Sequence, residues 1–238
     1  MRDKSGSAPS TPSLPLVMLD KALALQAPLT EHHIARLRRN HPNATPAEIV
    51  GRLNKELRAA TITAGAGVGA TAAAPGVGTA VALALSGVEA VAFLNATVLY
   101  VLARGEVQGV TLVDIERRRT LVMAVMLGDA AASGVGKVAE RTGQYWTQRI
   151  IRNIPMPKIR AVNNVLGKNF VTKFGTKEGI IVLGRVIPFG IGAFIGGTAN
   201  FFFSQGIITA SNSAFGPIPQ AWEIQPSEFD SPLPVNDA

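Results

Sequence analysis

The chain has 238 residues, of which 47% are hydrophobic and 16% are charged, with a formal net charge of +7 and no cysteine. This length is sufficient to bury a substantial core, and the composition excludes a disordered chain or a coiled coil. The absence of cysteine excludes disulfides, thiolate metal sites and cysteine nucleophiles.

The N-terminal segment 1–30 is expected to be disordered or weakly ordered, because its first half is rich in Ser and Pro. It does not resemble a secretory signal, since the short apolar run that follows is interrupted by Pro15. A cytoplasmic protein is therefore the expectation. We place one helical domain at 31–212 and a Pro-rich acidic tail at 213–238.

A helix start is predicted at Thr45. Thr45 takes the N-cap position, Pro46 the first helical position, and Glu48 the position three residues after the cap, which together make a capping box. The apolar residues that follow at helical spacing are Ile49, Val50, Leu53 and Leu57. This helix leads directly into an apolar stretch.

The stretch 61–103 contains a single charged residue, Glu89, and a helix break at Pro75. It predicts two apolar helices folded against each other, either in a membrane or at the centre of a bundle. Residues 59–74 are too few to cross a bilayer, which needs about 20 apolar residues, whereas 79–103 is long enough to cross with tilt. A charged Glu89 near the bilayer centre would cost at least about 2.5 kcal/mol, so a re-entrant or interfacial hairpin is favoured over two full crossings.

Two further helices are predicted after this hairpin. Thr111 is expected to cap a helix whose character continues to about Arg152, and Pro155 and Pro157 then break the chain. A basic amphipathic helix is predicted across 158–178. Its apolar residues recur at every fourth position: Val162, Leu166, Phe170 and Phe174.

A second apolar stretch covers 179–210, with Arg185 as its only charged residue. Gly192 and Gly196 have the spacing that favours close contact between helices. This stretch is expected to pack against the first apolar hairpin. No basic residue follows Arg185, so the C-terminal tail is acidic.

Several motif-like patterns do not carry chemistry. Residues 65–70 resemble a dinucleotide-binding loop but follow a helix instead of the strand that this motif requires. Residues 134–137 resemble a P-loop but lack the hydroxyl residue that would bind Mg²⁺. His32, His33 and His41 have no acidic cluster at ligand spacing, so a surface role is expected. We therefore expect no enzyme activity, no cofactor and no metal site.

Four polar residues in or beside the apolar stretches form a candidate buried polar site: Glu89, Asp129, Arg185 and Asn200. A buried charge needs a partner, so one interpretation is a structural ion pair between Glu89 and Arg185, with Asp129 as a further candidate partner. The other interpretation is a functional polar site between helices.

A resemblance to a known family rests on features spread over about residues 60–210. They are the Ala/Gly stretch with Pro75, Gly76, Val77 and Gly78, the following helix with Glu89, the segment 109–128, and the segment 184–193 followed by Gly196, Gly197 and Asn200. In these features the chain resembles the EcsC family of bacterial proteins, except that Glu89 stands where the family pattern has aspartate. The resemblance implies a helical, membrane-associated protein without an assigned reaction, and it transfers no catalytic residues.

The sequence thus predicts an all-α helical bundle with Gly/Ala-rich apolar helices, associated with the cytoplasmic face of a membrane as a peripheral or partly inserted protein. The expected role is accessory or structural, with the lipid surface and a membrane protein as partners and nucleic acid not expected. The basic flanks of the apolar stretches suit an anionic lipid surface. The alternative is a soluble helical bundle that binds a lipid or other apolar ligand between helices 61–103 and 180–210.

Overall fold

The computed structural model describes residues 13–72, 79–110, 112, 114–128, 154–174 and 197–222, with only the backbone described for 64–72, 79–89 and 197–200. This part of the chain contains α-helices and no strand, which confirms the all-α prediction. The helices are α1 (Leu14–Asn40), α2 (Pro46–Ala72), α3 (Thr79–Val107), α4 (Ile115–Leu127), α7 (Met156–Phe174) and α9 (Gly197–Phe215).

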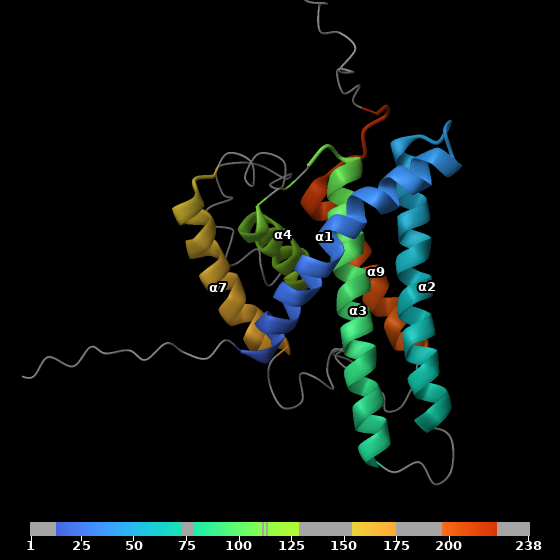
Figure 1. The fold of residues 1–238 in the computed structure, drawn as a ribbon, viewed down its shortest axis with the longest axis vertical. Helices are drawn as coiled ribbons and strands as arrows, with labels where there is room; N and C mark the ends of the chain where they lie inside the picture. Colours follow the sequence, from blue (N-terminus) through green and yellow to red (C-terminus); the bar gives the residue numbers. More distant parts are fainter. Residues whose placement is uncertain are drawn as a thin grey trace, which may run out of the picture.

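Helix α3 is the central element of the fold. It packs against α1, α2, α4 and α9, while α7 packs mainly on α4 and also contacts α1. Helices α2 and α3 run side by side, α9 lies along them, and α1 crosses α3 obliquely (Figure 1). At the end where residues 72 and 79 face each other, α2 and α3 project beyond α1 and α4 (Figure 1).

The core collects apolar side chains from all six described helices. It includes Leu19 and Leu23 of α1, Ile49 and Leu53 of α2, Phe93, Val98 and Val101 of α3, Leu121 and Val122 of α4, Leu166 and Phe170 of α7, and Ile208 and Phe215 of α9. In the described part of the chain, one helical window, Ala90–Val107, is long and apolar enough to cross a membrane, and 67% of it is buried inside the protein. This half of α3 therefore packs as the core helix of a bundle.

The prediction for the N-terminal segment is wrong from residue 14 onward. Residues 14–30 belong to α1, which is one continuous helix to Asn40. Pro15 does not prevent the helix because it lies in the first turn, where a missing backbone N–H costs nothing. Burial of Leu19 and Leu23 holds the segment on the bundle. Residues 1–12 lie outside the described part of the chain.

The predicted capping box at the start of α2 is confirmed. The backbone N–H of Glu48 donates to Thr45 Oγ1 over 3.3 Å, and the backbone N–H of Thr45 donates to Glu48 Oε2 over 2.8 Å. The predicted cap of α4 is wrong, because Asp114 takes the N-cap position and α4 begins at Ile115. Asp114 Oδ1 accepts from the backbone N–H groups of Glu116 and Arg117. The Asp114 carboxylate therefore provides the hydrogen-bond acceptor for the first turn of α4, the role that was predicted for Thr111.

Helix α4 ends at Leu127, and Gly128 follows with a positive φ of 59°. Lys173 of α7 supports this end, because its Nζ donates to the carbonyl oxygens of Met126 (3.2 Å) and Leu127 (3.4 Å). Burial lowers the pKa of Lys173. The predicted helical continuation to about Arg152 lies outside the described residues.

Helix α7 begins at Met156, directly after the predicted break at Pro155, whereas Pro157 does not break the chain and lies in the first turn of α7. Helix α7 covers the predicted basic amphipathic helix as far as Phe174. The predicted tail boundary at 213 is wrong, since α9 continues to Phe215 and the chain then packs back on the bundle. The Trp222 indole donates to the Ala44 carbonyl oxygen over 2.9 Å, and the Arg38 guanidinium lies 4.4 Å from the centre of its ring. Residues 223–238 are outside the described part.

Candidate functional site

The four residues of the predicted polar site are only partly placed by the structure. Glu89 lies in α3 and Asn200 in α9, where the backbone alone is described, and Asp129 and Arg185 lie outside the described residues. The proposed Glu89–Arg185 ion pair therefore stays a prediction. Asn95, a further polar residue of the apolar hairpin, joins α3 to α1 by accepting from the Gln26 side-chain amide over 2.9 Å.

The described helices instead bring together a different set of polar side chains, which we call the polar seam. The seam runs along the interface of α2, α3 and α9. Its residues are Asn54, Arg58 and Thr61 of α2, Thr97, Tyr100 and Arg104 of α3, Gln108 directly after α3, and Ser204, Ser211 and Asn212 of α9. Spacings of three or four residues place the α2 and α3 members on one face of each helix, and Ser204 and Ser211 are two turns apart.

Arg104 is the most unusual residue of the seam, because its side chain is only 1% exposed. Its Nε donates to Gln108 Oε1 over 3.0 Å and its Nη2 donates to Asn212 Oδ1 over 3.1 Å. Both acceptors are neutral. In the part of the chain that the structure describes, no carboxylate lies within ion-pair distance of Arg104.

Tyr100 lies one turn before Arg104 and donates its hydroxyl to Asn54 Oδ1 over 2.8 Å. Burial raises the pKa of Tyr100, and the neighbouring Arg104 guanidinium and Ser211 hydroxyl oppose that rise. Burial also lowers the pKa of Arg104, although a guanidinium remains charged at neutral pH. The seam therefore contains a neutral phenol beside a buried positive charge, an arrangement that costs several kcal/mol of desolvation unless it is compensated.

Three buried polar atoms of the seam have no hydrogen-bond partner among the described residues. They are Arg58 Nε, Thr97 Oγ1 and Arg104 Nη1. Buried polar groups in native proteins are nearly always satisfied by protein, water or ligand. The seam contains no histidine and no carboxylate, so its chemistry is that of a hydrogen-bond donor site without a general base.

A second feature is an exposed apolar surface, which we call the apolar end. It consists of Ile62 of α2, Val91 of α3, and Phe201 and Phe202 of α9, with exposed fractions of 36%, 45%, 40% and 58%. The three helices meet here, since the Phe93 and Phe203 rings lie 4.7 Å apart and the Arg58 guanidinium lies 5.9 Å from the centre of the Phe201 ring.

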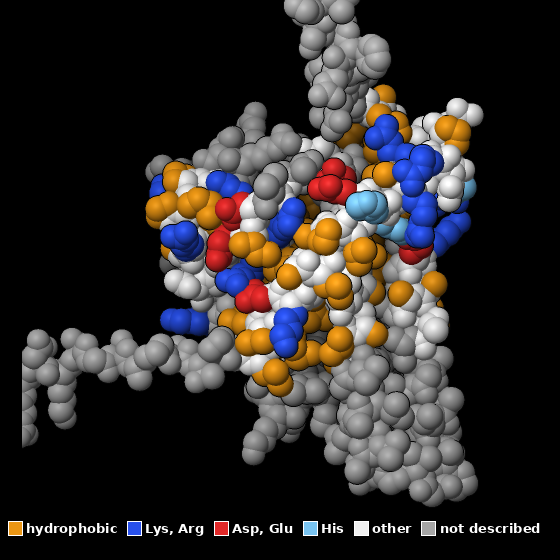
Figure 2. Space-filling view, in the orientation of Figure 1, with side chains coloured by type: hydrophobic (Ala, Val, Ile, Leu, Met, Phe, Trp, Pro, Cys, Tyr) orange, Lys and Arg blue, Asp and Glu red, His pale blue; other side chains and the backbone are white. Residues whose placement is uncertain are grey.

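Basic side chains gather elsewhere, over the C-terminal end of α1 and the first turns of α2 (Figure 2). The exposed members are Arg36, Arg38, Arg39, Arg52 and Lys55. His32 is exposed here, and His33 Nε2 lies 2.7 Å from Glu56 Oε2. The predicted surface position of the histidines thus agrees with the structure for His32, whereas His33 is largely covered by its contacts.

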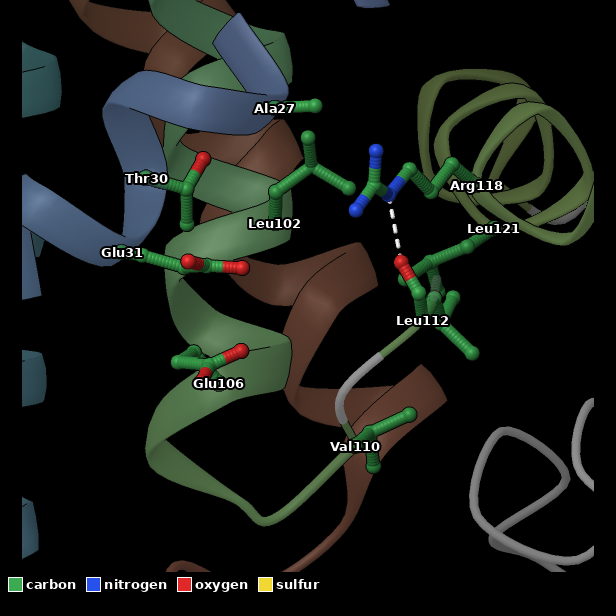
Figure 3. Close-up of a pocket in the computed structure, with 9 residues that line it drawn as sticks. All are labelled: Ala27, Thr30, Glu31, Leu102, Glu106, Val110, Leu112, Arg118 and Leu121. Atoms are coloured by element: carbon green, nitrogen blue, oxygen red, sulfur yellow. Dashed lines mark hydrogen bonds between the residues drawn. The ribbon is translucent and has the colours of Figure 1, made fainter. Parts of the chain in front are cut away.

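A pocket lies between α1, α3 and α4 (Figure 3). It is lined by Ala27, Thr30, Glu31, Leu102, Glu106, Val110, Leu112, Arg118 and Leu121. Arg118 extends from α4 toward this space and donates from Nε to the Leu112 carbonyl oxygen (Figure 3). The cavity volume of about 20 Å³ suffices for one water molecule and is far below what a lipid needs.

No family model, curated protein or solved structure matches this chain.

The sequence does not predict the polar seam, because Arg104 directly follows the apolar stretch 61–103 and looks like one of its basic flanking residues. A signal was present, since Tyr100, Arg104 and Gln108 recur at four-residue intervals and share a helix face with the apolar core. Whether that face is buried depends on α9, which lies more than a hundred residues later in the chain.

Proposed function

We propose that this protein is a membrane-associated accessory protein that binds a lipid surface through its apolar end. The observation that carries the proposal is the gathering of Ile62, Val91, Phe201 and Phe202 on three adjacent helices. Large apolar side chains grouped on a surface mark interaction sites. Residues 59–88, which include the projecting turns of α2 and α3, contain no charged residue.

Arg58, whose guanidinium lies over the Phe201 ring, is the basic residue beside the apolar end, and it supports an interfacial mode of binding. Arg58 marks the last charged position of α2, and Arg52 and Lys55 precede it on the same helix. Each basic residue near an anionic lipid surface contributes about 1 kcal/mol. Arg58 also donates to Gln205 Oε1 over 2.8 Å, which fixes it at the border between the apolar end and the basic half of α2.

The depth of insertion follows from the burial of α3. The window Ala90–Val107 is 67% enclosed by protein. Val91, near its N-terminal end, is exposed and belongs to the apolar end, whereas the turns after it pack into the core and leave no continuous face for lipid. Peripheral or partial insertion is therefore proposed in place of a full crossing. The resemblance to the EcsC family supports the same class of protein, and a cytoplasmic membrane face remains the expectation. No reaction is proposed.

The alternative function, binding of an apolar ligand between the two apolar helices, has less support. The Phe93 and Phe203 rings fill the contact between α3 and α9 at a centroid distance of 4.7 Å. The pocket of Figure 3 lies on the other side of α3, against α1 and α4.

The test compares two exposed side chains of nearly equal exposure, Phe202 at the apolar end (58%) and Leu25 on α1 (57%). Binding of purified protein to vesicles of phosphatidylcholine and phosphatidylglycerol is measured by flotation. We expect Phe202→Gln to weaken binding about tenfold, because burying a large apolar side chain is worth about 1.5–3 kcal/mol. Leu25→Gln should bind as the unchanged protein does.

Equal effects of the two substitutions would contradict the proposal, as would a protein that stays in the lipid-free fraction at every vesicle concentration. A protein that floats with vesicles of pure phosphatidylcholine equally well would assign the binding to the apolar end alone and remove the role of the basic residues.

A further inference from the structure

The basic side chains at the end of α1 and the start of α2 form one charged surface, which we call the basic surface (Figure 2). Residues three positions apart share a helix face, so each helix presents a pair of basic residues on one side. The exposed members of the basic surface are Arg36, Arg38 and Arg39 of α1, and Arg52 and Lys55 of α2.

The two helices of the basic surface are joined by His33. Its ring nitrogens lie 3.2 Å from Arg36 Nη2 and 2.7 Å from Glu56 Oε2. Glu56 thus has a local partner, and so does Glu48, which accepts from the backbone N–H of Thr45 over 2.8 Å. Five basic side chains beside these two carboxylates leave an excess of positive charge, which attracts an anionic partner.

The described part of the chain ends on the basic surface. The Trp222 indole donates over 2.9 Å to the carbonyl oxygen of Ala44, which lies between α1 and α2. The Arg38 guanidinium lies 4.4 Å from the centre of the Trp222 ring, a cation–π contact. These contacts fix the position of Trp222, so the chain continues into Glu223 from a point beside Arg38.

The residues after Trp222 carry the opposite charge. Residues 223–238, which we call the acidic tail, contain no basic residue and four acidic ones: Glu223, Glu228, Asp230 and Asp237. Since an extended residue spans at most about 3.3–3.6 Å, Asp230 reaches up to about 26–29 Å from Trp222. Lys55 lies only about 14 Å along α2 from the first residue of that helix. The acidic tail is therefore long enough to cover the basic surface.

We propose that the acidic tail docks on the basic surface of its own chain, with its carboxylates against the basic side chains of α1 and α2. Because Trp222 holds the start of the tail, the contact is intramolecular, and tethering raises the effective concentration of the tail at this surface. Any other anion must displace the tail to reach the surface. This contact goes beyond the lipid binding proposed above and requires no membrane.

The test uses the full chain in solution without vesicles. The chain has no cysteine, so Ser231→Cys provides a single attachment point for a nitroxide spin label. A nitroxide broadens the NMR signals of nearby backbone amides. We expect broadening of the amides of residues 36–39 and 52–55, and none at the exposed basic residues of α7. If the amides of 52–55 keep their full intensity, the proposal is wrong.

Salt separates charge attraction from tethering alone. The Debye length falls from about 10 Å at 0.1 M salt to about 3 Å at 1 M, so exposed charges lose most of their attraction at the higher concentration. We expect the broadening of residues 52–55 at the lower concentration and its loss at the higher one. Broadening that persists unchanged would mean that charge does not hold the tail, and would overturn the proposal.

Two triple variants assign the contact to the basic surface. Each removes three positive charges from exposed side chains, and Arg38 is kept because it contacts Trp222. The test variant carries Arg39→Gln, Arg52→Gln and Lys55→Gln. The control variant on α7 carries Lys158→Gln, Arg160→Gln and Lys168→Gln. We expect the test variant to lose the broadening of residues 52–55 and the control variant to keep it, and equal broadening in the two would contradict the proposal.

A mixing experiment distinguishes docking within one chain from exchange of tails between two copies. Isotope-labelled protein without a nitroxide is mixed with unlabelled protein that carries the nitroxide at position 231. Only contacts between different molecules broaden the observed signals, so we expect no broadening of residues 52–55. Broadening as strong as in the singly labelled chain would assign the tail to a second copy and would overturn docking on its own chain.

Discussion

At the scale of single residues, Asn163 shows how one buried amide joins two helices. It accepts from Thr120 Oγ1 over 2.6 Å and donates to the Glu116 carbonyl oxygen (2.9 Å) and Glu116 Oε2 (2.6 Å). We expect Asn163→Ala to lower the free energy of unfolding by about 1–3 kcal/mol, because the three hydrogen bonds that join α7 to Thr120 and Glu116 of α4 are lost. Urea denaturation measures the change.

The adjacent Asn164 is the control for this substitution. It has the same side chain on the same helix but is exposed. Asn164→Ala should change the free energy of unfolding by no more than about 0.5 kcal/mol. If both substitutions destabilise the protein equally, the loss reflects helix propensity or the denatured state, and the network between α4 and α7 contributes nothing.

Apolar faces could be predicted residue by residue, whereas buried polar residues could not. The every-fourth pattern of Leu166, Phe170 and Phe174 is a local property of α7, and all three side chains are buried. Arg104 and Asn163 look like solvated residues in the sequence. Their burial is decided by α9 and α4, which pack on them from distant parts of the chain.

At the scale of the helix, the capping box of α2 makes its stability depend on pH. The backbone N–H of Thr45 is the main cause that lowers the pKa of Glu48 below its ordinary value of 4.5, and the Thr45 hydroxyl and Arg52 act in the same direction. A carboxylate with a lowered folded-state pKa stabilises the protein above the unfolded-state pKa. That contribution is lost as the pH falls through the folded-state pKa.

We therefore expect Glu48→Gln to be less stable than the unchanged protein at neutral pH, with a difference that shrinks below pH 4.5 and vanishes in stronger acid. Gln can still accept from the Thr45 backbone, so the substitution removes the charge and keeps the shape. Unfolding midpoints in urea from neutral to acid pH give the two curves. Parallel curves would mean that the charge of Glu48 does not act through the cap.

The helix boundaries show where local signals are sufficient. The capping box places the start of α2 correctly, because all of its bonds lie within four residues. Thr111 and Asp114 are both acceptable caps by residue type, and the structure uses Asp114. The N-terminal part of α1 has little local signal for order. It is helical because Leu19 and Leu23 enter a core formed by later helices.

At the scale of the whole molecule, composition alone left two environments open for the apolar hairpin. The same apolar side chains are stable in a bilayer and in a protein core, so the sequence could predict the helices without predicting what surrounds them. The bundle resolves this for one half of α3, where Phe93, Val98 and Val101 contact protein on all sides. The candidate polar site of Glu89, Asp129, Arg185 and Asn200 depends on parts of the chain that the described core does not include.

This division of α3 predicts two classes of backbone amide. In detergent-free solution, the backbone amides of residues 93–103 should exchange with deuterium only through global unfolding. This segment of the central helix is enclosed by α1, α2, α4 and α9. Adding anionic vesicles should leave their exchange unchanged and slow the exchange of the α2 and α3 turns nearest residues 72 and 79. Hydrogen exchange with peptide-level resolution measures both classes in one experiment. If vesicles instead accelerate exchange in 93–103, the bundle opens on the membrane and α3 crosses it, since a core helix can become a spanning helix only by losing its protein partners.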